Sequence, residues 1–168
     1  RTPSVTQWLR HTDATGAVTG CTVELATLLA GERLAVEGFK KGALMVLGLA
    51  MQTYGQRLSD EQEVLMHASD MLIDVYTAES AVLRAAAAAD GRMPRAALHA
   101  DAVRVLVSDA SMRIEGSGRQ ALAAMVEGDS LKTMLAALRR LFRTPPVNTA
   151  LLRRGLAAEA VERGAYIF

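Results

Sequence analysis

Apolar residues recur at helical spacing along three long segments of this chain, and no other feature limits its possible folds as strongly. These segments are residues 22–53, 59–89 and 95–126. Apolar residues at positions i, i+3, i+4 and i+7 predict amphipathic helices that bury one face. The chain has only three Phe, three Tyr and one Trp. Because Ala, Leu, Val and Met dominate the apolar residues, the composition also favours helices over strands.

Two boundary signals are specific enough to predict where helices begin. Ser59-Asp60-Glu61-Gln62 has the pattern of a capping box, in which the first and last side chains bond each other's free backbone N–H groups. We therefore expect the second helix to begin at Ser59. Asn148 is placed to cap a last helix that ends at Gly164.

Two shorter helical segments follow the three long ones. One runs from Asp129 or Ser130 to about Phe142, and the other covers residues 148–164 after the break at Pro145-Pro146. Short predicted connections favour antiparallel neighbours. The sequence thus predicts an all-α fold, an up-and-down helical bundle with about four main helices plus a short C-terminal helix. We assign residues 1–21 to a linker or entry segment and residues 22–168 to the bundle domain.

Four glycines lie within the first predicted helix: Gly31, Gly38, Gly42 and Gly48. Each glycine in a helix interior costs roughly 1 kcal/mol relative to alanine. They should weaken or split this helix unless close packing requires them.

Charge is distributed unevenly along the chain, although its net charge is only +1. Residues 59–91 hold seven acidic residues and one basic residue, whereas residues 129–168 hold seven basic and three acidic residues. We expect these complementary regions to lie close enough to interact. A net charge near zero also argues against a nucleic acid as partner.

The sequence offers no complete catalytic, cofactor-binding or metal-binding site. Gly116-Ser117-Gly118-Arg119-Gln120-Ala121 matches the G-x-G-x-x-A dinucleotide pattern, which needs a tight turn between a strand and a helix. Here the residues on both sides share one helical phase, so we interpret these small residues as places where another helix comes close. His11, His67 and His99 are far apart in sequence, and the single Cys21 has no basic neighbour to activate it.

Residues 131–143 form the most amphipathic segment. A basic face opposite a Leu and Phe stripe suits an anionic membrane surface or a protein partner. The same pattern is typical of a bundle helix whose apolar face packs inside. We favour packing, and we keep the basic face as a candidate membrane or partner surface. This face consists of Lys132, Arg139, Arg140 and Arg143.

No uncharged apolar stretch is long enough to predict a transmembrane helix. The single cysteine favours a reducing compartment, so we expect a cytoplasmic protein, with association with a membrane surface left open. The chain begins at Arg1 rather than at methionine, which indicates a fragment of a longer polypeptide.

Several short motifs follow one another along the chain in a distinctive order. They include Leu58-Ser59-Asp60-Glu61-Gln62-Glu63, Ile73-Asp74-Val75-Tyr76, Met112-Arg113-Ile114, Leu138-Arg139-Arg140-Leu141 and Pro146-Val147-Asn148-Thr149. In this order they resemble the extra C-terminal helical domain of acyl-CoA dehydrogenases of the very-long-chain type. The resemblance covers roughly residues 35–168.

In that family, the flavin, the acyl-CoA chain and the catalytic glutamate belong to preceding domains. The resemblance therefore implies an accessory domain without catalysis of its own, in a parent that uses FAD in fatty-acid β-oxidation. It also implies partners: the catalytic domains of the same chain, a second copy in a homo-oligomer such as a dimer, and a peripheral membrane contact. The alternative is a stand-alone helical ligand-binding or dimerisation module, such as the effector domain of a transcriptional regulator.

Overall fold

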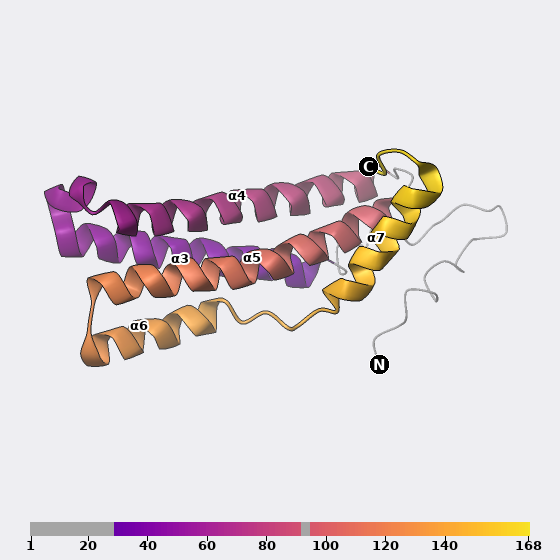
Figure 1. Ribbon diagram of the computed structural model, residues 1–168. Helices are drawn as coiled ribbons and strands as arrows, with labels where there is room; N and C mark the ends of the chain where they lie inside the picture. Colours follow the sequence, from indigo (N-terminus) through magenta and orange to yellow (C-terminus); the bar gives the residue numbers. More distant parts are fainter. Residues whose placement is uncertain (1–28, 92–94) are drawn as a thin grey trace.

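The computed structural model describes residues 29–91 and 95–168, and it is helical with no strand in these ranges. Three long helices come first: α3 (Ala30–Tyr54), α4 (Gln62–Asp90) and α5 (Ala96–Met125). The shorter helices α6 (Gly128–Leu141) and α7 (Thr149–Arg163) follow, and a 3-10 turn, η1 (Gly55–Asp60), joins α3 to α4. The predicted all-α class is confirmed (Figure 1).

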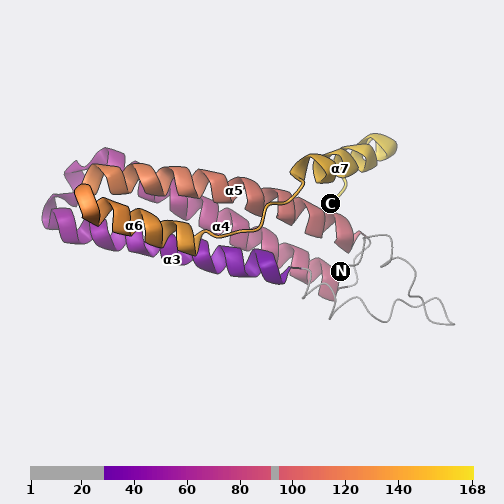
Figure 2. The ribbon, with the colours of Figure 1, turned by 90° about the horizontal axis from the view of Figure 1, so that it is seen from below.

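The helices form an up-and-down bundle in which α3, α4 and α5 all pack against one another. Helix α6 packs on α3 and α5, on the side of the bundle opposite to α4 (Figures 1 and 2). Helix α7 packs on α5 and crosses one end of the bundle. The bundle is therefore built around α5, which contacts every other long or short α-helix.

The core is filled by a few large side chains separated by many alanines. Small residues let helices approach closely, and the large ones then fill the remaining space. The seven largest fully buried side chains come from α3, α4, α5 and α6 and from the residue that precedes α3. They are Leu29, Phe39, Val46, Met71, Ile114, Leu122 and Leu138.

Most predicted helix ends agree with the structure to within a few residues. The side-chain oxygen of Asn148 accepts a hydrogen bond from the backbone N–H of Leu151 at 3.1 Å, so the predicted cap is confirmed. Helix α7 ends at Arg163 and is followed by Gly164, whose φ of 62° is left-handed, as expected of a glycine stop. The predicted linker, residues 1–21, and the start of the first predicted helix at 22–28 lie outside the described residues.

The predicted start of the second helix at Ser59 is wrong. Ser59 lies within η1, and α4 begins at Gln62 after Glu61, which makes no side-chain cap hydrogen bond. Instead, the backbone N–H of Glu61 bonds the carbonyl oxygen of Leu58 at 3.2 Å. The chain turns tightly after Gly55, whose φ is positive, and this turn keeps Ser59 out of the N-cap geometry.

Two of the four glycines in α3 are required by close packing, and α3 is continuous through all four. A Cβ atom on Gly38 would overlap the backbone carbonyl of Leu141, and one on Gly42 would overlap the ring of Phe142. Gly31 and Gly48 have nothing within 4 Å of an added Cβ atom. Helix α6 can therefore lie close to α3 only because Gly38 and Gly42 lack side chains.

The close contact at Gly38 predicts a stability difference between two otherwise similar substitutions. Gly38→Ala should lower the free energy of unfolding by about 1–3 kcal/mol, because the new methyl group meets backbone that cannot rotate away. Gly48→Ala is the matched control and should raise the free energy of unfolding by up to about 1 kcal/mol through helix propensity. Urea denaturation of both variants measures these changes. If Gly38→Ala were as stable as Gly48→Ala, α6 would not pack on α3 as described.

Candidate functional site

The four candidate basic residues Lys132, Arg139, Arg140 and Arg143 are all exposed. Lys132 makes an ion pair with Asp129 at 2.9 Å within the first turn of α6, and both side chains are largely in solvent. Arg139 and Arg140 lie in the last turn, where the helix dipole favours positive charge. This group, the α6 basic face, thus points away from the bundle.

The apolar side of α6 packs within the bundle. Leu138 is fully buried and Phe142 is 5% exposed. The ring of Phe142 lies edge-on against that of Phe39, with 5.7 Å between centroids and 80° between planes. The packing interpretation of this stripe is therefore confirmed, and any docking by α6 would have to use its charged side.

The predicted contact between the acidic segment 59–91 and the basic C-terminal segment is wrong. Among the residues that the structure describes, no ion pair joins the two segments, and the two α4 carboxylates that are paired take their partners from α3 and α5: Lys40 pairs with Glu79 at 2.5 Å, and Arg113 with Asp74 at 2.5 Å. Arg153 of α7 pairs with Asp109 of α5. The close contacts at the glycines of α3 hold α6 on the side of the bundle opposite to α4 (Figure 1).

The G-x-G-x-x-A segment lies inside α5, with helical residues on both sides. A Cβ atom on Gly118 would lie 3.0 Å from a methyl carbon of Leu138 and 3.3 Å from the Cε methyl carbon of Met71. Gly118 therefore marks a place where α4, α5 and α6 meet, as the packing interpretation predicts. A dinucleotide needs free backbone N–H groups at a strand-to-helix turn, and this segment provides none.

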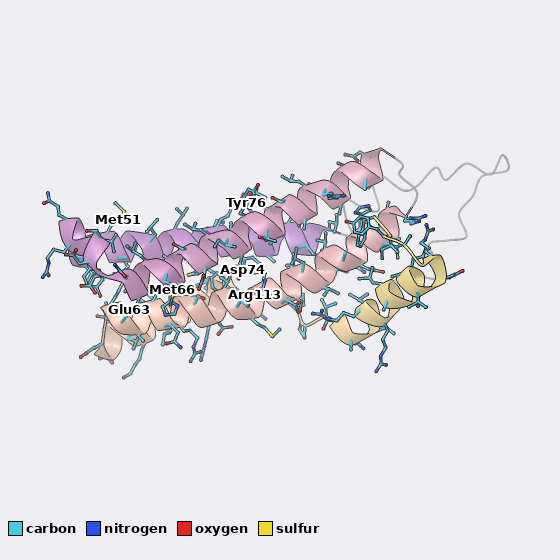
Figure 3. The ribbon with its side chains drawn as sticks, turned by 45° about the horizontal axis from the view of Figure 1, so that its top comes forward. Met51, Glu63, Met66, Asp74, Tyr76 and Arg113 are labelled. Carbon is cyan, nitrogen blue, oxygen red and sulfur yellow. The ribbon has the colours of Figure 1, made fainter. Side chains whose placement is uncertain are left out.

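An open groove of about 580 Å³ lies between α4 and α5. Its centre is the Asp74–Arg113 pair, in which the carboxylate is 13% exposed and the guanidinium 52% exposed (Figure 3). Hydrogen bonds from both Nε and Nη2 of Arg113 reach Asp74, and they raise the pKa of the guanidinium. His67 and Asp70, which the sequence places on one face, line the same groove.

This groove is poorly suited to catalysis or to FAD. It is open to water, and its two carboxylates, Asp70 and Asp74, would repel a pyrophosphate. Within residues 29–91 and 95–168, no three His, Cys, Asp or Glu side chains are grouped to hold a metal ion. His11 and Cys21 lie outside the described residues.

Two charged clusters were not predicted from the sequence. Arg104 lies between Asp101, at 3.5 Å, and Glu32, at 3.9 Å, and burial raises the pKa of Asp101. At the end of the bundle, the ring of His99 packs on Phe168, and burial together with nearby Arg84 lowers the pKa of His99. The spacing of Asp101 and Arg104 indicates their pairing within a helix, but the contact with Glu32 depends on the tertiary fold.

Comparisons with known proteins identify the kind of domain. The family described as "Acyl-CoA dehydrogenase, C-terminal domain" matches residues 38–140. A "Probable acyl-CoA dehydrogenase" of Bacillus subtilis (strain 168) is 41% identical over 141 residues, which cover 83% of this chain and 24% of that protein. A crystal structure of an acyl-CoA dehydrogenase complexed with FAD from Bacillus anthracis superposes with a TM-score of 0.81 and 35% identity.

The crystal structure is also matched over 83% of this chain and 24% of the other. The chain thus spans about a quarter of the length of each of these relatives. Among the residues that the structure describes, no helix is both long and apolar enough to cross a membrane. The matched family, the sequence identity and the shared fold agree, and the chain belongs to the acyl-CoA dehydrogenase family as its C-terminal domain.

Proposed function

We propose that this chain is an accessory C-terminal domain of a larger FAD-dependent acyl-CoA dehydrogenase that acts in fatty-acid β-oxidation. The observation that carries the proposal is that about a quarter of a "Probable acyl-CoA dehydrogenase" matches most of this chain. The Bacillus anthracis relative has FAD in its structure. In this proposal, FAD and the acyl substrate bind to the rest of the parent chain, and the bundle contributes to assembly.

The described surface supports a role in assembly more than one in chemistry. The large apolar side chains of α6 pack on the core, whereas its cations and many apolar side chains of other helices face outwards. Such surfaces mark interactions with other proteins or with membranes. The partners we propose are the catalytic domains of the same chain and a second copy of the protein. The comparisons do not favour the alternative of a stand-alone ligand-binding module.

For the isolated 168-residue chain, we predict no flavin binding and no dehydrogenation. When the chain is retained by ultrafiltration, added FAD should pass through the membrane into the filtrate. We expect this because the described residues form no enclosed crevice for a flavin. With a series of acyl-CoA esters, reduction of an artificial electron acceptor should not exceed the protein-free rate. A complete acyl-CoA dehydrogenase serves as the positive control. Stoichiometric flavin binding or turnover by this chain would overturn the accessory role.

We further propose a cytoplasmic protein whose α6 basic face contacts anionic membrane surfaces peripherally. Because the apolar stripe of α6 packs against the core, we expect the contact to be electrostatic. Binding to vesicles that contain anionic lipid should therefore be lost as ionic strength rises, since the Debye length is about 10 Å at 0.1 M salt.

A triple substitution tests this membrane contact. Arg139→Gln, Arg140→Gln and Arg143→Gln together should abolish co-sedimentation with anionic vesicles. The matched control removes three exposed charges elsewhere: Arg33→Gln, Lys41→Gln and Arg57→Gln. Equal loss in both triple variants would show that net charge alone is responsible, and no binding by the unmodified chain would contradict the proposal.

A further inference from the structure

Helix α4 carries a second row of large apolar side chains on the face turned away from the bundle. Its inner face is buried through Val64, Met71, Val75 and Val82. On its outer face, Met66, Ile73, Tyr76 and Leu83 are 53%, 62%, 74% and 61% exposed. Ile73 lies at the edge of this row and also lines the groove between α4 and α5. Figure 3 shows Tyr76 at the upper edge of α4, apart from the Asp74–Arg113 pair between α4 and α5. A helix that is apolar on two opposite faces is usually covered on both.

The outer row has the spacing that a partner helix requires. Exposed positions separated alternately by three and four residues run along α4, and none of them is charged. This 3.5-residue period is that of the a and d positions of a coiled-coil seam, whereas a solvated helix face is polar. Four large apolar residues are interspersed with three small ones along it. The α4 outer seam consists of Met66, Ser69, Ile73, Tyr76, Ser80, Leu83 and Ala87.

We propose that the α4 outer seam binds the same seam of a second copy of this chain, with the two α4 helices antiparallel about a two-fold axis at the level of Ala78. This inference rests on the assembly role proposed above and names the partner and the surface. A two-fold interface brings the same surface from both copies together.

Side-chain size is complementary in this arrangement. With the axis at the level of Ala78, Tyr76 lies opposite the partner's Ser80, and Ile73 lies opposite the partner's Leu83. The small Ser80 leaves room for the tyrosine ring, and symmetry repeats each contact. The two large apolar pairs then lie on either side of the axis.

The charges beside the seam favour a second copy as the partner and an antiparallel direction of the two helices. Arg84 is the one basic residue of α4, and it follows Asp70 by two heptads on the same flank of the seam. Both side chains are exposed, and neither has an ion-pair partner among the residues that the structure describes. In the antiparallel pairing, each Asp70 faces the partner's Arg84. In a parallel pairing, each of these residues would instead lie at the same height as its own copy, which has the same charge.

The opposite flank of the seam is compatible with the same pairing. Glu79 lies on that flank close to the proposed axis, so the two copies of Glu79 would approach each other. Each is already paired with its own Lys40 at 2.5 Å. The lysines therefore compensate the approach of the two carboxylates.

Charge reversal provides the first test, by sedimentation of the 168-residue chain over roughly 1 to 200 µM. The unmodified chain should show a concentration-dependent dimer. Asp70→Arg alone and Arg84→Asp alone should each raise the dimer dissociation constant about tenfold or more, because each places two like-charged pairs in the interface. An equimolar mixture of the two variants should restore association, since every pair in the mixed dimer is again opposite in charge.

Cysteine cross-linking tests the direction of the helices, with Cys21 replaced by Ser. Thr77→Cys lies beside the axis and should give a disulfide-linked dimer under mild oxidation. Ser69→Cys should not, because its two copies would be about 27 Å apart along antiparallel helices. A monomeric chain, single reversals without effect, or cross-linking through Ser69→Cys would each overturn the proposal. None of these results would affect the assignment to an acyl-CoA dehydrogenase, which the flavin and turnover measurements test separately.

Discussion

The close approach of α6 to α3 is the contact on which the rest of this domain depends. The absence of a Cβ atom at Gly38 and Gly42 lets the Leu141 backbone and the Phe142 ring lie directly on α3. On the other side of α6, Leu138 fills the space that Gly118 leaves in α5. A helix held this closely cannot turn its apolar stripe outwards, because its large side chains already complete the core. The charged side of α6 is thereby fixed as the outer surface of the domain.

This placement also determines where charge appears on the molecule. With α6 packed on α3 and α5, the two paired carboxylates of α4, Glu79 and Asp74, bind Lys40 of α3 and Arg113 of α5. The α6 basic face and the acidic helix consequently lie on opposite sides of the bundle. Both surfaces remain available to other molecules, and α4 adds an apolar seam that its own bundle does not cover. These outward-facing surfaces support the proposed role of the domain in assembly with a larger enzyme.

Local sequence patterns predicted the helices well, because periodicity and helix stops act over a few residues. Asn148 illustrates this, since its cap bond is made within a single turn. The predicted helix start at Ser59 was wrong because the capping box contains no information about the tight turn at Gly55 that precedes it. Global charge balance also failed as a guide: exposed ion pairs are weak, and packing at Gly38 decides which helices meet. The groove centred on Asp74 and Arg113 was missed because its residues are distant in sequence and only the fold brings them together. The basic face of α6 was recognised from its amphipathic pattern, but the pattern alone could not decide what its apolar side contacts.

Native-state hydrogen exchange of α6 tests the central claim, that this short helix is an integral part of the core. Helix α7 provides the comparison within the same molecule, because it is of similar length and has no buried residue. If the glycine contacts hold α6 as described, its central amide protons should exchange only as fast as those of α3, and much more slowly than those of α7. Exchange of α6 at the rate of α7, while α3 stays protected, would show that α6 is a loosely attached surface helix and would contradict this account.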